Sequence, residues 1–236
     1  MTTRTRAIVA WLVAGHLLVG GLYWLLIQVP ESNAWMLVAS LVIALAALVM
    51  TGVIEVTAIL AWTASEPMGV ALKTALLRAW LGVLPLAVFG CVWWLTGAAD
   101  DWLARHAGQI DAWIIAKTGW TKTAALHTSL VWVSAFVRYG IGTSLAVALL
   151  AALARQGPRG ATSSWLRRGL AWKPLVIITA VLFVGVWLPW QAVSWRPASL
   201  PPTWVQPAFA TVKLGVLYLV GNLAWAVVLR TAARQT

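Results

Sequence analysis

The residues best placed to do chemistry are four polar side chains within long apolar runs: His16, Thr51, Glu55 and Asn222. A polar group in hydrocarbon is costly, so it usually faces protein or water. At about 1.5 Å of helix rise per residue, His16, Glu55 and Asn222 would lie roughly 10–14 Å from the same edge of a membrane. Three helices would then place polar groups at one level. Thr51 would lie one turn from Glu55 on the same helix face.

Two interpretations of this polar layer follow from the residue types. In the structural one, His16, Glu55 and Asn222 form hydrogen bonds between helices, which stabilise the bundle by about 0.6–2 kcal/mol per contact. In the functional one, Glu55 and His16 form a protonatable pair that binds an ion, a proton or a substrate. The sequence leaves both interpretations open.

Motifs of the common enzyme classes are missing from the sequence. It contains no glycine-rich phosphate loop, no HExxH, no GxSxG and no paired-carboxylate motif. Its three histidines are too few and too scattered for a multi-haem cytochrome. The single cysteine, Cys91, excludes a disulfide within the chain and a metal–thiolate cluster. We therefore assign no catalytic residue, no metal site and no cofactor from the sequence.

The elements that carry these residues are predicted to be membrane helices. Hydrophobic residues make up 61% of the 236 residues and charged ones 10%, whereas soluble domains contain about 45–50% and about 25%. Lipid must therefore be the solvent, and the expected fold is an all-α, polytopic membrane helix bundle that forms one domain over residues 1–236. Six runs are long enough to span a bilayer: residues 7–29, 34–62, 80–97, 126–154, 174–193 and 208–229.

The basic residues predict the orientation of this bundle. Eleven of the seventeen lysines and arginines fall on the side that carries both termini, and four fall on the other side: Arg105, Lys117, Lys122 and Arg196. The positive-inside rule then places the N and C termini in the cytoplasm. The net charge of +11 is a topology signal, and we expect no nucleic-acid partner because no loop offers a continuous basic face with interleaved aromatics.

Three segments between the spans have helical patterns of their own. Residues 100–117 predict an amphipathic helix that lies flat on the outer surface. The cytoplasmic segments 65–85 and 157–174 each place an arginine seven residues before a proline. This likeness raises the hypothesis of a duplication, with two parallel hairpins. Both segments predict short interfacial helices that present basic anchors to lipid phosphates: Arg78, Arg167 and Arg168.

Tryptophans gather near the predicted outer ends of the spans, and residues 186–207 alone hold four tryptophans and five prolines. Because indole prefers the headgroup level, we interpret these residues as an interfacial belt, with a sugar- or lipid-binding surface as the alternative. Twelve of the eighteen tryptophans belong to this group: Trp24, Trp35, Trp93, Trp94, Trp102, Trp113, Trp120, Trp132, Trp187, Trp190, Trp195 and Trp204.

Other residues of the spans predict packing and anchoring. Arg138 and Lys213 fall near the outer ends of their spans, where a long basic side chain reaches the interface. Span 126–154 also contains a run of small residues, which predicts one close helix contact: Gly140, Gly142, Ser144 and Ala146.

Three function hypotheses remain from the sequence. The first is an integral membrane subunit, a permease-like or scaffolding component of a complex in a bacterial inner membrane. The second is a stand-alone transporter that is coupled to protons or ions through Glu55 and His16. The third is a membrane enzyme that acts on lipid-linked substrates at the outer face. The expected partners are membrane lipids and either another protein or a second copy of the chain.

Overall fold

The computed structural model describes residues 2–30, 33–63, 67–162, 164–193, 195 and 204–234. Every regular element among these residues is helical, which confirms the predicted all-α class. Residues 194 and 196–203 of the tryptophan- and proline-rich segment lie outside the described residues. The α-helices are α1 Thr3–Gln28, α2 Ala34–Thr63, α3 Met68–Arg78, α4 Val83–Thr118, α5 Thr123–Ala135, α6 Thr143–Gln156, α7 Ser164–Gly169, α8 Trp172–Leu182, α9 Leu188–Val193 and α10 Val205–Ala233.

Six helical stretches are long and apolar enough to cross a membrane, which supports the predicted integral membrane protein. The third, fourth and fifth contain more than one of the helices named above, joined without a loop. The stretches are Thr3–Gln28, Ala34–Thr63, Met68–Thr118, Thr123–Ala161, Trp172–Val193 and Val205–Ala233.

Helix α4 is longer than the sequence predicted. A helix boundary was expected between the span 80–97 and the amphipathic segment 100–117, but α4 continues without interruption to Thr118. It ends at Gly119, whose φ of 69° lies in the left-handed region that favours glycine. At about 1.5 Å per residue such a helix is roughly 54 Å long, whereas a hydrocarbon core is about 30 Å thick. The whole helix therefore fits within the hydrocarbon core only if it is strongly inclined. Otherwise part of it protrudes from the core.

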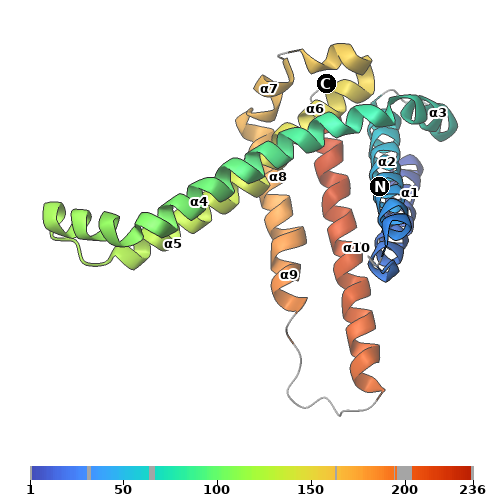
Figure 1. Cartoon of the computed structure of the whole chain (residues 1–236). Helices are drawn as coiled ribbons and strands as arrows, with labels where there is room; N and C mark the ends of the chain where they lie inside the picture. Colours follow the sequence, from blue (N-terminus) through green and yellow to red (C-terminus); the bar gives the residue numbers. More distant parts are fainter. Residues whose placement is uncertain are drawn as a thin grey trace.

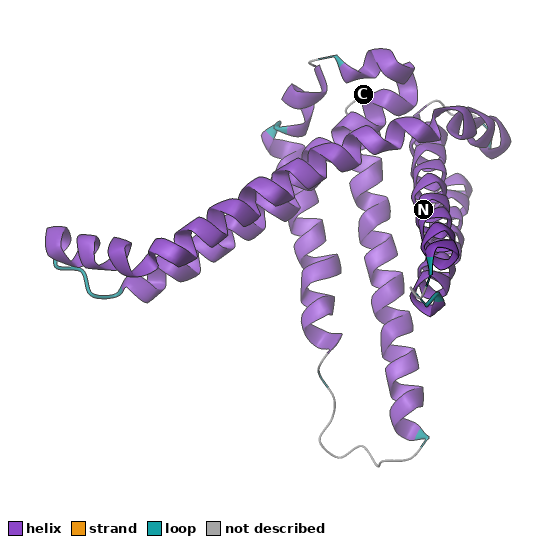
Figure 2. Cartoon of the chain, viewed as in Figure 1, coloured by secondary structure: helices purple, strands orange, loops and turns teal. Residues whose placement is uncertain are grey.

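The helices separate into two parts (Figure 1). Helices α1, α2, α8, α9 and α10 run along the bundle, and α4 and α5 form an antiparallel hairpin that runs obliquely away from it. The N-terminal pair α1 and α2 lies beside α10, and α3 and α6 lie near the end of the bundle that carries the C terminus. Figure 2 shows that the described residues outside the helices form short loops and turns.

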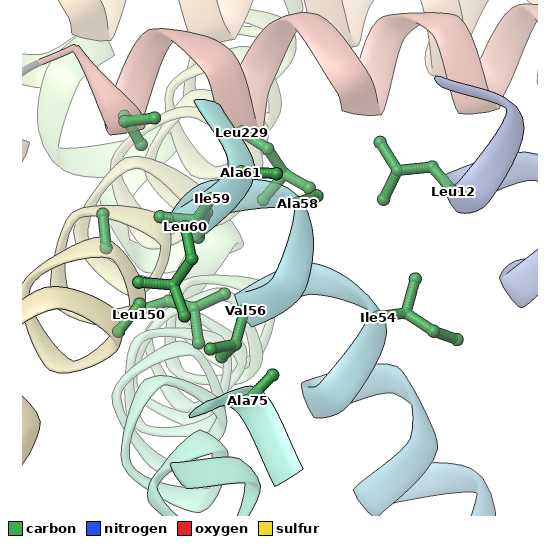
Figure 3. Packing of buried hydrophobic residues seen from close by; sticks show 14 of the residues in the cluster. Leu12, Ile54, Val56, Ala58, Ile59, Leu60, Ala61, Ala75, Leu150 and Leu229 are labelled. Carbon is green, nitrogen blue, oxygen red and sulfur yellow. The ribbon is translucent and has the colours of Figure 1, made fainter. Parts of the chain in front are cut away.

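The core lies where α1, α2, α6 and α10 meet (Figure 3). Leu12, Ile59, Leu150 and Leu229 come from these four helices and are each at most 5% exposed. Many of their neighbours are alanines, whose small side chains let helix backbones approach closely. The core therefore fixes the helices that carry the predicted polar layer. By contrast, no residue of α5 is buried, and Pro85 is the buried residue of α4.

Two spans are interrupted by π-helical segments. The segment η2, Phe136–Gly142, joins α5 to α6, and the segment η4, Phe183–Trp187, joins α8 to α9. A π-helical turn contains more residues than an α-helical one, so the side chains after it are rotated relative to those before it. Such segments are frequent at functional sites. Two shorter 3₁₀ segments, η1 Ala79–Gly82 and η3 Gly157–Ala161, follow α3 and α6.

Candidate functional site

Part of the predicted polar layer forms a contact between α1 and α10. The Nδ1 atom of His16 lies 2.7 Å from the side-chain oxygen of Asn222. The amide nitrogen of Asn222 donates to the carbonyl oxygen of Tyr218 at 2.9 Å. The hydroxyl of Tyr218 in turn donates to the carbonyl oxygen of Val13 at 2.7 Å. These bonds lock the two helices together, because a broken bond would leave polar atoms without partners in apolar surroundings.

Glu55 joins a different pair of helices. The indole nitrogen of Trp225 on α10 donates to Glu55 Oε1 on α2 at 3.0 Å. Five residues before His16, Trp11 donates from α1 to the carbonyl oxygen of Ile54 on α2 at 3.1 Å. Thr51 donates to the carbonyl oxygen of Ala47 in its own helix at 2.8 Å. The structure thus brings His16 to Asn222 and Glu55 to Trp225, and no hydrogen bond joins the described side chains of His16 and Glu55.

The small residues predicted to form one close contact meet several elements. A Cβ on Gly142 would lie 3.2 Å from Val92 on α4, and a Cβ on Gly140 would lie 2.6 Å from the hydroxyl of Thr179 on α8. Ser144 donates to the carbonyl oxygen of Gly169 on α7 at 2.7 Å, and Ala146 is half-buried. The small side chains therefore let three different helices approach one stretch of η2 and α6.

The three predicted lipid anchors lie in different environments. Arg78 donates to the carbonyl oxygen of Ala154 near the C-terminal end of α6. The helix dipole favours a cation at that end. Arg167 is exposed. The Nη1 atom of Arg168 is buried and has no hydrogen-bond partner among the described residues. Of these three arginines, only Arg167 has an exposed side chain.

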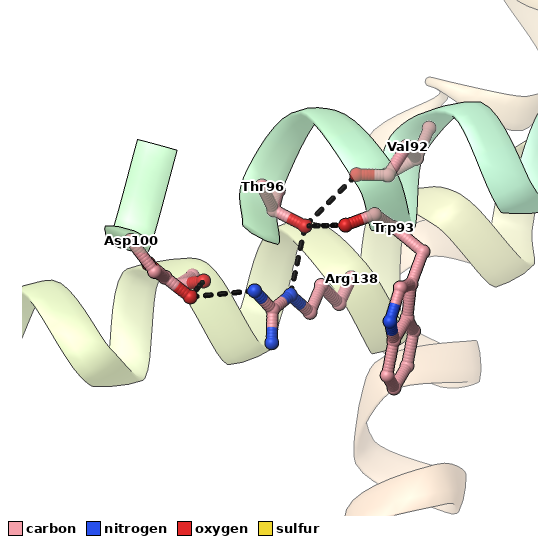
Figure 4. A network of polar contacts seen from close by, with 6 residues as sticks. Val92, Trp93, Thr96, Asp100 and Arg138 are labelled. Carbon is pink, nitrogen blue, oxygen red and sulfur yellow. Dashed lines mark hydrogen bonds and ion pairs between the residues drawn. The ribbon is translucent and has the colours of Figure 1, made fainter. Parts of the chain in front are cut away.

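A polar network within the α4–α5 hairpin escaped the sequence analysis (Figure 4). Arg138 on η2 forms an ion pair of 2.6 Å with Asp100 and donates from Nε to the hydroxyl of Thr96 at 2.8 Å. Ser134 donates to the same Asp100 oxygen at 2.9 Å. The guanidinium carbon lies 5.2 Å from the ring centroid of Trp93, which is within cation–π range. Arg138 thus has several protein partners, where the sequence predicted an interfacial anchor.

A second pair lies nearer the tip of the hairpin, where His127 Nε2 is 2.9 Å from Asp111 Oδ1. The spacing in the sequence contains a signal for both pairs. Asp111 and His127 are each eight residues from Gly119, and Asp100 and Arg138 are each nineteen residues from it. In an antiparallel hairpin that turns at Gly119, residues at equal distances from the turn face each other. The predicted boundary near residue 98 hid this register.

A cavity lies between the two π-helical segments. Its volume is about 440 Å³, within the usual range for ligand pockets of about 300–1,000 Å³. Gly140 and Thr143 on one side and Thr179 on the other belong to its lining, and Thr179 Oγ1 is a buried hydroxyl oxygen without a partner among the described residues. We call this cavity the aromatic groove after its six aromatic side chains: Trp132, Phe136, Tyr139, Phe183, Trp187 and Trp190.

The sequence analysis missed the aromatic groove because it treated Trp132, Trp187 and Trp190 as members of an interfacial belt. The recurrence of aromatic residues in 132–139 and in 183–190 is the sequence signal that these two segments share. Lys213, predicted as an outer anchor, donates to the carbonyl oxygens of Val193 at 2.5 Å and Trp195 at 2.8 Å. It therefore holds the end of α9 against α10.

Comparisons with known proteins give limited information. No family model matches the chain, and no solved structure matches it. Among curated proteins, the chain is 39% identical over 57 residues to the lysylphosphatidylglycerol biosynthesis bifunctional protein LysX of Nocardia farcinica. The similar stretch covers 24% of this chain and 5% of that protein. A likeness of this extent does not establish a family or an activity.

Proposed function

We propose that this protein is a permease-like or scaffolding subunit of a membrane complex, and that the α4–α5 hairpin is its contact with another membrane protein. The observation that carries the proposal is the ion pair between Asp100 and Arg138. Both residues belong to stretches long and apolar enough to span a membrane. Their side chains are nevertheless 40% and 22% exposed.

A charged pair open to hydrocarbon is unfavourable, so charges in spans usually face protein or water. The two helices of the hairpin are little buried within the chain, since α5 has no buried residue and Pro85 is the buried residue of α4. A helix of a partner protein packed along the hairpin would shield the pair from lipid and bury apolar side chains beside it. Val131 on α5, which is 67% exposed, offers such a surface.

The remaining helices supply the rigid base that a docking subunit needs. Bonds among α1, α2 and α10 run through His16, Glu55 and Asn222, and each joins two helices. The similarity over 57 residues to a protein named for the biosynthesis of a lipid is consistent with a membrane role. It transfers no activity to this chain.

The experiment is site-specific photo-crosslinking in the native membrane, followed by native mass spectrometry of the gently extracted protein. A benzophenone amino acid at Val131 tests the hairpin, and one at Ile27 on α1, which is 79% exposed, is the matched control. We expect a reproducible adduct with a second protein from position 131 and none from position 27. A lone monomer without protein adducts would refute the proposal, and an adduct between two copies of this chain would reassign the hairpin to self-association.

A further inference from the structure

We infer that the aromatic groove is a specific binding site for one hydrocarbon chain of a membrane lipid. This inference is independent of the proposed subunit role, because the groove lies between η2 and η4 and its walls do not include Asp100 or Arg138. The lining belongs to two stretches that are long and apolar enough to span a membrane, Thr123–Ala161 and Trp172–Val193. The medium around the groove is therefore hydrocarbon.

The walls of the groove are preformed by contacts between aromatic rings. Phe183 stacks on Trp187 with 4.7 Å between ring centroids, and Trp132 lies 5.5 Å from Trp187 in a tilted arrangement. Trp132 comes from α5 and Trp187 from η4, so this second contact joins the two sides of the groove. Aromatic side chains have few rotatable bonds, so a ligand loses little side-chain entropy when it packs against them.

The chemistry of the lining selects an uncharged, apolar occupant. None of the groove's lining residues is a lysine, arginine, aspartate or glutamate. The nearest basic residue along η2, Arg138, turns its guanidinium to Asp100 and Thr96 on α4. The hydroxyls of Thr143 and Thr179 are the small polar groups of the wall, beside the larger aromatic surfaces.

The groove is also open to the medium around it. Phe136, Tyr139 and Phe183 are 41–48% exposed, and Trp190 is 71% exposed at its rim. A chain from an adjacent lipid can therefore enter laterally without any change of fold. An acyl chain is long, thin and apolar, and it contacts all these rings at once.

The test is photolabelling in vesicles of phosphatidylethanolamine and phosphatidylglycerol that contain a phosphatidylethanolamine with a diazirine in its acyl chain. Labelled peptides are quantified by mass spectrometry. We expect residues 132–143 and 179–190 to carry severalfold more label than residues 205–220. The latter segment includes Val212, Leu214 and Val216, which are 53–67% exposed, so ordinary surrounding lipid reaches it equally well.

Two valines of η4 provide the matched variants. Val186 lines the groove and is 47% exposed, whereas Val184 is 61% exposed and lies outside the lining. Val186→Trp fills the groove and is expected to lower its labelling to the level of residues 205–220, while Val184→Trp leaves it unchanged. Ala135→Leu, which fills the groove from the opposite wall, is expected to repeat the loss if Val186→Trp fails to fold. Uniform labelling along all exposed helices, or equal effects of the two valine variants, would overturn the inference.

Discussion

At the scale of single residues, polar side chains join the helices of this protein in pairs. The side-chain oxygen of Asn222 accepts from Nδ1 of His16, and the amide nitrogen of Asn222 donates to the backbone of its own helix. Asp100 accepts hydrogen bonds from both Arg138 and Ser134. In apolar surroundings each of these groups depends on its partner, so a single substitution affects two helices.

The contact between His16 and Asn222 predicts a measurable coupling energy. Asn222→Leu keeps the side-chain size and removes the hydrogen bond, so we expect it to lower the free energy of unfolding by about 1–2 kcal/mol. In a double-mutant cycle with His16→Leu, the coupling should be about 0.6–1.7 kcal/mol. Unfolding in mixed micelles measures both quantities. Strictly additive effects of the two substitutions would contradict a direct bond.

The ion pair of the hairpin predicts a difference between two adjacent aspartates. Asp100→Asn removes the charge that faces Arg138, and we expect a loss of about 1 kcal/mol of unfolding free energy, as for a polar contact between membrane helices. Asp101→Asn is the matched control, because Asp101 accepts from Arg105 Nε through its backbone carbonyl oxygen, which the substitution leaves in place. The control should change stability by less than about 0.5 kcal/mol. Equal losses in the two variants would argue against a role for the pair in holding the hairpin.

At the scale of elements, each π-helical segment contains glycine that packs closely against a neighbouring helix. A Cβ on Gly185 in η4 would come within 2.2 Å of the Ala224 side chain on α10, so only glycine fits between these elements. Gly140 and Gly142 have the same role in η2, against α8 and α4. The two π-helical segments therefore lie where glycine lets a neighbouring helix approach closely. The aromatic groove lies between them.

Two glycines provide the test of this packing. Gly185→Ala is expected to destabilise the protein by about 1–3 kcal/mol through overpacking against α10. Gly215→Ala, on α10 itself, meets nothing within 4 Å. It should be neutral or stabilising by up to about 1 kcal/mol, because alanine favours helix over glycine. Thermal unfolding of the two variants in the same detergent compares them, and a stable Gly185→Ala variant would show that η4 and α10 are farther apart than described.

At the scale of the whole molecule, the bundle and the hairpin have different amounts of internal support. The bundle has a continuous core of residues from α1, α2, α6 and α10, whereas α5 has no buried residue and Pro85 is the buried residue of α4. This division supports a role for the hairpin as a surface for a partner. The side of the membrane that the tip of the hairpin faces depends on the orientation of the chain. The basic residues predict that orientation.

Labelling of single cysteines tests that orientation. Cys91 is free and exposed, so the background variant is Cys91→Ala. Thr121→Cys lies at the tip of the hairpin and Gln156→Cys at the other end of the same candidate span. With both termini in the cytoplasm, an impermeant maleimide should label position 121 in intact cells and position 156 only after permeabilisation. The reverse pattern would overturn the predicted topology.

The sequence by itself determined the helical class and the six apolar stretches. Long runs such as 34–62 and 208–229 cannot remain in water, and helices satisfy their backbone hydrogen bonds internally, so composition and length were sufficient. The ends of α2 fall at Ala34 and Thr63, close to the predicted limits. The sequence also singled out His16, Glu55 and Asn222, because a polar residue in an apolar run stands out without any knowledge of its neighbours.

Only the tertiary structure decided which of these residues meet. The partner of a side chain depends on the rotation and register of its helix, and packing of distant segments sets both. That is why Glu55 bonds with Trp225 while His16 bonds with Asn222, and why Arg138 meets Asp100 across a hairpin that the sequence had divided at residue 98. The aromatic groove likewise exists only because η2 and η4, more than forty residues apart, line the same cavity.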